Sequence, residues 1–281
     1  MATLVCFHAH PDDEAISTGG TMAKAATEGH RVVLVVATGG EHGEVPDDLA
    51  EGETLVDRRR AETERSCATL GVARLEFLGY RDSGMTGWDQ NADPSSFHQS
   101  DLDEAAERLA TILRDEAADV VTIYDWHGVY GHPDHIKVHT VGKRAAEFAA
   151  ASGLAGLRVL EATANRDEMI RQMTDAIESG EMTPPGGEHD GGQDDDFDPG
   201  GPADDGNPFG EPESVLTLRV DVTDHIDAKR TALRSHRSQV TDSSFFLEMS
   251  DEVFSRAFGT EWFIEHDRQP PWRDGWIFED V

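Results

Sequence analysis

Short apolar runs alternate with segments of helical pattern along the first half of the chain. The runs are rich in Val, Leu and Ile, and the segments between them carry apolar residues at helical spacing. This alternation is typical of βα units and of a parallel sheet. The pattern predicts strands at 4–8, 31–37, 75–78, 120–124 and 157–162, and helices at 14–28, 57–70, 102–113 and 136–151.

The run at 31–37 is almost continuously β-branched, which is typical of a strand covered on both faces. We therefore expect an α/β fold, a Rossmann-like, mostly parallel sheet with helices on both faces. The pattern resumes with a predicted strand at 215–222 and a predicted helix at 224–238. These form a C-terminal strand-helix extension, so 1–182 and 215–281 are predicted to belong to one domain.

The segment 183–214 interrupts this pattern. It contains ten acidic residues, eight Gly, six Pro and no Lys or Arg. Such a composition buries too little apolar surface to offset the entropy of ordering the chain. We expect an acidic, mobile surface insertion between the two parts of the domain.

Composition narrows the class of protein further. The 281 residues include 56 acidic and 24 basic side chains, with a formal net charge of −32. This excess argues against nucleic-acid or anionic-membrane partners, which require clustered Lys and Arg. No apolar run approaches the roughly 20 residues of a membrane span, and the start lacks the pattern of a signal peptide. With Cys6 and Cys67 in a predicted strand and a predicted helix, we expect reduced thiols and a cytoplasmic protein.

Two His- and Asp-rich clusters follow predicted strands. The first is His8-Ala9-His10-Pro11-Asp12-Asp13-Glu14, and the second is Tyr130-Gly131-His132-Pro133-Asp134-His135. One such cluster alone is weak evidence, because Asp beside Pro also caps helices. Ligands of doubly wound sheets, however, lie at the carboxyl ends of strands. Together the clusters predict one metal site whose imidazole and carboxylate ligands suit zinc, or the Fe(II) of an oxygenase.

These clusters resemble the LmbE-like or PIG-L family of zinc-dependent N-acetyl-sugar deacetylases. The resemblance extends to Arg59-Arg60-Ala61-Glu62, Tyr80-Arg81-Asp82-Ser83-Gly84-Met85 and His236-Arg237-Ser238-Gln239, so it covers most of the chain apart from the acidic insertion. Within the family, the chain is most similar to the actinobacterial deacetylase and S-conjugate amidase of mycothiol metabolism.

The resemblance implies a division of labour between neighbouring residues. His10, Asp13 and His135 would hold zinc, and Asp12 would be the general base. Zinc lowers the pKa of bound water towards 7, but a carboxylate must still accept the proton during attack. Asp12 can do so because it adjoins a ligand without being one.

Further roles are also carried over from the family. His132, steadied by Asp134, would protonate the departing amine, and Tyr130 would help zinc to stabilise the oxyanion. Three positions match residues that can hold sugar or cyclitol hydroxyls: Arg59, Asp82 and Glu44. His236 matches a position near the pocket, but the sequence indicates no role for it.

The expected reaction is hydrolysis of the N-acyl group of a small amino sugar such as N-acetylglucosaminyl-inositol. An amidase acting on thiol S-conjugates of the same sugar is an alternative with the same metal chemistry. An Fe(II) oxygenase and a non-catalytic sugar-binding module are alternatives of other classes. A dinucleotide-binding domain is rejected, because 17–21 lacks the Gly-x-Gly-x-x-Gly pattern. A homo-oligomer is compatible with the sequence.

Overall fold

The computed structural model describes residues 1–179, 197–241 and 244–279. Its strands form one eight-stranded sheet in the order β3-β2-β1-β4-β5-β7-β6-β8. Neighbouring strands are parallel except at β7, which is antiparallel to both β5 and β6. The predicted mostly parallel sheet is therefore confirmed. The strands are β1 Thr3–His8, β2 Arg31–Thr38, β3 Arg74–Tyr80, β4 Val120–Tyr124, β5 Arg158–Thr163, β6 Leu218–Asp221, β7 Thr260–Ile264 and β8 Arg273–Asp274.

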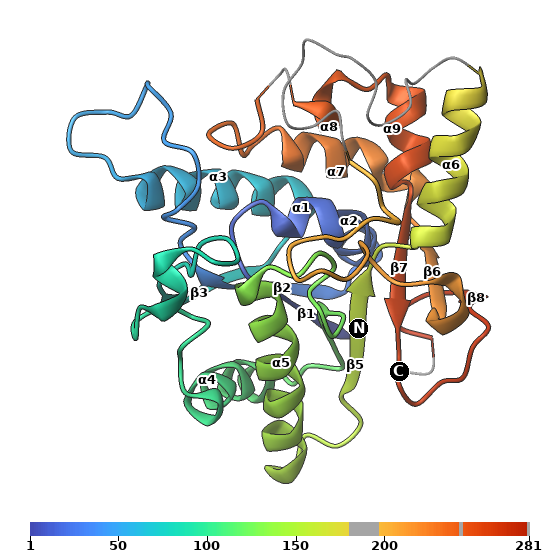
Figure 1. Ribbon diagram of the computed structural model, residues 1–281. Coiled ribbons are helices and arrows are strands. Elements are labelled where there is room, and N and C mark those ends of the chain that lie inside the picture. The colour runs from blue at the N-terminus through green and yellow to red at the C-terminus, as the bar shows by residue number, and fades with distance from the viewer. Residues whose placement is uncertain (180–196, 242–243, 280–281) are drawn as a thin grey trace.

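Helices cover both faces of the sheet, as Figure 1 shows. One face carries α1 Asp13–Ser17, α2 Gly19–Thr27, α3 Leu55–Leu70 and α7 Ile226–Leu233, and the other carries α4 Leu102–Asp115 and α5 Pro133–Ala151. The remaining helices are α6 Arg166–Ser179, α8 Phe245–Glu248 and α9 Asp251–Phe258. Among the helices described, none combines the length and the apolar character that crossing a membrane requires.

The alternation of side chains along the central strands divides the core into two layers. In β1, Leu4 and Cys6 face the layer beneath α2 and α7, whereas Val5 and Phe7 face the layer beneath α4 and α5. All four side chains are fully buried. Because both faces of these strands are buried, their sequences are continuous apolar runs. Cys6 and Cys67 are both buried and free.

Several element boundaries differ from the predictions. The helix predicted at 14–28 is two helices, α1 and α2, separated at Thr18. Helix α5 begins three residues earlier than predicted, because Pro133 occupies the first turn, where its missing N–H costs nothing. The strand predicted at 215–222 is limited to β6. Helix α6 and strands β7 and β8 were not predicted.

The expected acidic insertion lies partly within the described chain. Residues 183–196 lie outside it, whereas 197–214 run beside the segment that precedes α5. The amide of Asp204 donates to the carbonyl of Tyr130 at 3.0 Å, and the amide of Gly210 donates to the carbonyl of Val129 at 2.6 Å. The second part of the acidic segment therefore borders the motif Tyr130–His135. The domain limits and the mobility of the insertion stay predictions.

Candidate metal centre and active site

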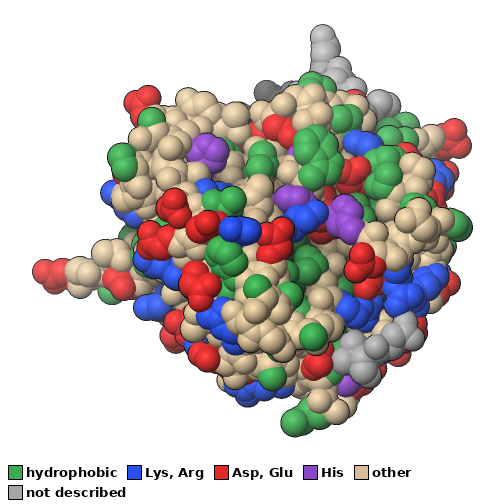
Figure 2. All heavy atoms as spheres, turned by 90° about the horizontal axis from the view of Figure 1, so that it is seen from below, with side chains coloured by type: hydrophobic (Ala, Val, Ile, Leu, Met, Phe, Trp, Pro, Cys, Tyr) green, Lys and Arg blue, Asp and Glu red, His purple; other side chains and the backbone are tan. Residues whose placement is uncertain are grey.

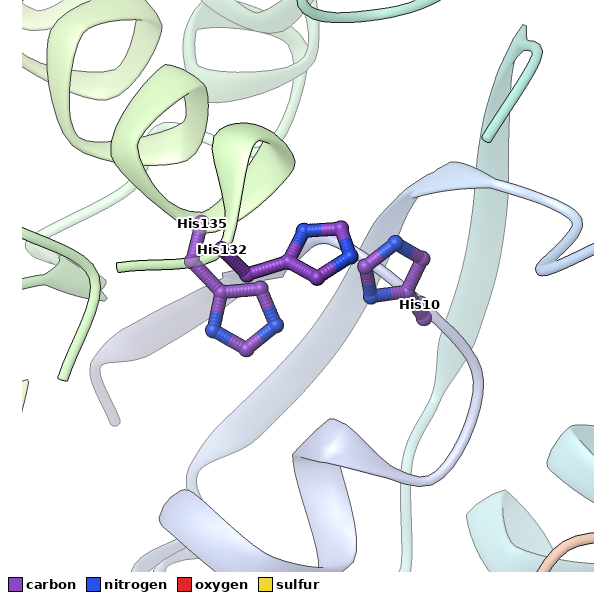
Figure 3. A group of neighbouring side chains, drawn as sticks. All are labelled: His10, His132 and His135. Atoms are coloured by element: carbon purple, nitrogen blue, oxygen red, sulfur yellow. The ribbon is translucent and has the colours of Figure 1, made fainter. Parts of the chain in front are cut away.

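The carboxyl ends of β1 and β4 bring the two motifs together. These strands are parallel neighbours, so the loop after β1 and the loop before α5 meet at one edge of the sheet. His10 comes from the first loop, and His132 and His135 come from the start of α5; Figure 3 shows their rings grouped together. One nitrogen from each ring lies within 4.8 Å of the others, and all three residues are buried. The single site expected from two motifs is thus assembled in space.

Asp13 completes the predicted set of metal ligands. Its Oδ2 lies 3.4 Å from His10 Nδ1 and 3.3 Å from His135 Nε2. Burial alone would raise the pKa of Asp13, but His135 and His10 hold it well below its usual value. A carboxylate and two imidazole nitrogens therefore converge on one point, and zinc and Fe²⁺ both accept such donors. These residues fit a divalent metal ion.

Two carboxylates lie near Nε2 of His10, the ring nitrogen that does not face Asp13. His10 Nε2 is 3.2 Å from Asp134 Oδ2 and 3.5 Å from Asp82 Oδ1. Ser83 fixes Asp134 by donating its amide to Oδ2 at 2.9 Å and its hydroxyl to Oδ1. A carboxylate on the far nitrogen of a metal-binding histidine orients the ring and selects its tautomer. The geometry therefore directs Nδ1 of His10 towards Asp13.

This arrangement corrects the expected contact between Asp134 and His132. The Asp134 carboxylate points to His10 and Ser83, and it is the backbone amide of Asp134 that donates to His132 Nδ1, at 3.1 Å. The reason is local, because His132 is the N-cap of α5 and accepts an amide from its first turn. With Nδ1 accepting, the neutral ring carries its hydrogen on Nε2.

Asp12 is held in an unusual conformation beside the ligands. Its φ is 88°, in the left-handed region that non-glycine residues rarely adopt. Arg59 donates to Asp12 Oδ2 at 3.0 Å and to the Pro11 carbonyl at 2.6 Å. Burial raises the pKa of Asp12, and the charge of Arg59 opposes this rise. Arg59 was expected to bind substrate, but in the structure its guanidinium is bonded to Asp12, the predicted general base.

Tyr130 contacts His135. Its hydroxyl is 3.5 Å from His135 Nε2, and the two rings are 4.9 Å apart in an edge-to-face arrangement. Burial and the nearby carboxylates, Asp13 first among them, hold the pKa of Tyr130 well above its usual value. The phenol therefore keeps its proton and can donate a hydrogen bond.

The two remaining predicted substrate contacts differ in position. Asp82 is buried beside His10, and it accepts the amides of Gly84 at 2.8 Å and His42 at 3.2 Å. Glu44 is exposed. Its backbone amide, not its carboxylate, makes the contact with Gln239, donating to Oε1 at 3.0 Å. Among the contacts of the described residues, none joins the Glu44 side chain to the metal centre.

A buried pair of side chains, His236 and Glu14, adjoins Asp12 and was not predicted. His236 Nε2 lies 2.7 Å from Glu14 Oε1, and both residues are fully buried. Burial alone would lower the pKa of His236, but the Glu14 carboxylate raises it. The motif at 236–239 was visible in the sequence; its partner was not, because 222 positions separate the two residues.

The comparison with family models decides the family. The model "PIG-L: GlcNAc-PI de-N-acetylase" matches residues 5–146, which include both motifs. The chain belongs to the PIG-L family. The resemblance found in the motifs is thereby confirmed, and a family of de-N-acetylases leaves no support for the oxygenase alternative.

Two relatives of this PIG-L family member are similar to it in sequence along most of their length. A protein of Nocardiopsis dassonvillei is 40% identical over 273 residues, which are 91% of each chain. A protein of Thermobifida fusca is 38% identical over 285 residues, covering 95% of this chain and 94% of the relative. Both are named 1D-myo-inositol 2-acetamido-2-deoxy-alpha-D-glucopyranoside deacetylase.

Solved structures confirm the fold. N,N'-diacetylchitobiose deacetylase from Pyrococcus horikoshii matches with a TM-score of 0.57 and 24% identity, covering 93% of this chain and 82% of that one. The 4-carboxy-2-hydroxymuconate hydratase GalB from Pseudomonas putida also matches, with a TM-score of 0.53, 16% identity, and coverage of 96% and 98%. Since the fold accommodates a hydratase as well as deacetylases, the fold alone does not define the activity, and the residues of the site do.

Proposed function

We propose that this protein hydrolyses the acetamide of an N-acetylated amino sugar, specifically an N-acetylglucosaminyl-inositol. The observation that carries the proposal is the position of Asp12, a carboxylate still 17% exposed, directly beside the convergent set His10, Asp13 and His135. The names of relatives about 40% identical over nine-tenths of the chain support the sugar. The proposed metal is zinc, with Fe²⁺ as an ion that accepts the same donors.

The residues around the ligands fit amide hydrolysis. Zinc, when bound, would supply Lewis acidity that activates water and polarises the amide carbonyl. Asp12 accepts the proton of the attacking water, and Arg59 fixes the carboxylate that receives it. The Tyr130 phenol donates to the oxygen that gains negative charge. The proton that Asp12 accepts passes on to the departing amine. Burial, with His10 beside it, lowers the pKa of His132 to about 2, so its neutral ring, with Nδ1 occupied, donates a hydrogen bond from Nε2 to the reacting amide rather than the proton itself.

Two of the residues expected to contact substrate already have partners within the site. Asp82 and Arg59, two of the residues expected to contact sugar hydroxyls, are already bonded to His10 and Asp12. We therefore assign them first to the orientation of the catalytic groups and only second to the sugar. The expected partner is a small molecule encountered in the cytoplasm.

The experiment that tests this function measures release of primary amine. Zinc-loaded protein is incubated with N-acetylglucosaminyl-inositol, and Asp12→Asn is assayed in parallel. Asn is the matched replacement, because it tolerates positive φ better than most residues. We expect amine release from the wild type and almost none from Asp12→Asn.

Two further outcomes would contradict the proposal. Release of amine only from an amide S-conjugate of the same sugar would indicate the amidase alternative. Binding of the sugar without release, unchanged in Asp12→Asn, would indicate a non-catalytic sugar-binding module.

A further inference from the structure

The His236–Glu14 pair connects a distant segment of the chain to the predicted base. His236 lies just after α7, and Glu14 lies in α1, one residue beyond the ligand Asp13. His236 and Glu14 are both 0% exposed, so neither can contact substrate. The mechanism derived above uses neither of them. A buried ion pair that performs no chemistry still requires an explanation, because burying two charges is costly.

The contacts of Glu14 provide that explanation. Glu14 Oε1 accepts His236 Nε2 at 2.7 Å and the Ser66 hydroxyl at 2.5 Å. Glu14 Oε2 accepts the backbone amide of Asp12 at 2.9 Å. The carboxylate is therefore held by donors on one oxygen and holds the peptide of Asp12 with the other.

The Asp12 peptide needs such support. A residue with a Cβ is strained at φ 88°, and strained residues persist only where the surroundings over-determine their conformation. Arg59 restrains the Asp12 side chain and the Pro11 carbonyl, but it does not reach the Asp12 amide. Glu14 supplies the missing restraint.

We propose that His236 is a positioning residue that acts through Glu14 to hold the Asp12 backbone in its strained conformation, and so aims the Asp12 carboxylate at the reacting water. This inference rests on the proposed function. It assigns a role to the motif at 236–239, whose first residue had none. Positioning residues around metal sites typically change affinity or activity by about 10- to 100-fold when removed.

The chain offers a matched control in the same segment. Ser238 is also buried and also bonds a buried glutamate, with its hydroxyl 2.6 Å from Glu62 Oε2. Glu62 lies on α3, and the contacts of Ser238 do not include Asp12 or Glu14. Ser238→Ala therefore removes a comparable buried hydrogen bond without releasing the Asp12 peptide.

The experiment compares His236→Leu, His236→Gln and Ser238→Ala. Gln can place an amide donor near the position of Nε2, so it should restore the bond to Glu14. We expect His236→Leu to keep zinc, to lower kcat about 10- to 100-fold and to leave KM nearly unchanged. We expect His236→Gln to regain most of kcat, and Ser238→Ala to keep the wild-type kcat even where its Tm falls.

Hydrogen exchange gives a readout that needs neither metal nor turnover. Each metal-free protein is measured at a temperature the same number of degrees below its own Tm. Amides of the segment 9–16 should then exchange faster in His236→Leu than in wild type or Ser238→Ala. If His236→Leu fails to fold, Glu14→Gln takes its place, because an amide offers one acceptor oxygen where two are needed.

Three results would overturn the proposal. They are unchanged exchange at 9–16, equal loss of kcat in His236→Gln and His236→Leu, and a loss of kcat in Ser238→Ala as large as that in His236→Leu. A wild-type protein that releases no amine refutes the proposed function instead, and the exchange measurement still tests the positioning role.

Discussion

At the scale of single residues, Asp12 and Asp13 have opposite electrostatic surroundings. Asp13 is buried and Asp12 is largely enclosed, and removal from water by itself raises a carboxyl pKa. For Asp13 the nearby His135 and His10 reverse this effect and lower the pKa well below its usual value. For Asp12 burial prevails over Arg59, and the pKa is raised. Adjacent carboxylates with pKa values pushed apart are typical of groups with different roles.

The two aspartates should therefore respond differently to the same substitution. Asp13→Asn removes a charged ligand, so we expect it to lose zinc on dialysis. Asp12→Asn should retain zinc and lose about 10²- to 10⁴-fold in kcat, the usual contribution of a general base. Zinc content by elemental analysis and initial rates measure both effects. Zinc loss in Asp12→Asn with retention in Asp13→Asn would show that the roles are exchanged.

A second residue-scale prediction concerns Asp134. Its carboxylate orients His10, so Asp134→Asn should weaken zinc binding by about 10- to 100-fold while the fold is kept. Titration of the metal-free protein with zinc, against a competing chelator, measures the change. Lys137→Met, one turn further along α5 and bonded to the Ser100 carbonyl, serves as the control. An unchanged zinc affinity in Asp134→Asn would contradict the assigned orientation.

The sequence predicted which motif residues would meet at one point better than it predicted the contacts among their neighbours. His10 and Asp13 lie in one motif, and His135 lies in another at an equivalent strand end, so topology alone brings them together. The contact of Arg59 with Asp12 spans 47 positions, and that of Ser83 with Asp134 spans 51. Such contacts depend on how helices and loops pack, which one sequence does not encode as a local pattern.

At the scale of elements, β7 fixes the start of α2. Glu261 on β7 accepts the amides of Gly20 at 2.8 Å and Thr21 at 2.9 Å, both from the first turn of the helix. Lys229 of α7 donates to the same carboxylate at 2.7 Å. A carboxylate at a helix N-terminus satisfies amides that lack partners within the helix. One buried glutamate thus joins a strand and two helices.

This joint yields a stability prediction. Lys229 and Glu261 have side chains only 2% exposed, so Lys229→Met leaves a buried carboxylate without its countercharge. We expect a loss of about 3–5 kcal/mol in the free energy of unfolding, measured by urea denaturation. Arg171→Met, which breaks the more exposed pair with Glu213, should cost far less. Equal losses in the two variants would contradict this account.

The predictability of the elements follows their local patterns. Strands β1, β2 and β4 are continuous apolar runs, and α4 has apolar residues at regular helical spacing, so their types were clear. Helix α6 has no fully buried residue, which leaves little apolar pattern to detect. Strand β7 is five residues long, and its partners, β5 and β6, lie far from it in sequence. Its neighbours, rather than its own sequence, determine its place.

At the scale of the whole molecule, negative charge dominates the surface. The formal net charge is −32, and Figure 2 shows acidic side chains spread over the face that it presents, with basic ones among them. Such an excess destabilises the compact state through self-repulsion. Salt shortens the range of that repulsion from about 10 Å at 0.1 M to about 3 Å at 1 M.

We therefore expect Tm to rise with NaCl, most steeply below about 0.5 M, where screening changes most. Differential scanning fluorimetry at fixed pH measures the change. Sucrose, which strengthens burial by exclusion rather than by screening, is the control, and it should raise Tm without the early steep phase. A Tm that is flat or falls between low and moderate NaCl would show that self-repulsion has little weight in this fold.

The strand order has a consequence for synthesis of the chain. Strand β7 lies inside the sheet, between β5 and β6, although it is made after both. Until residues 260–264 have left the ribosome, β5 presents an unpaired edge, which can associate with other chains. The protein is therefore most exposed to aggregation late in translation, and a chain that stops before β7 should need chaperones far more than one that stops after it.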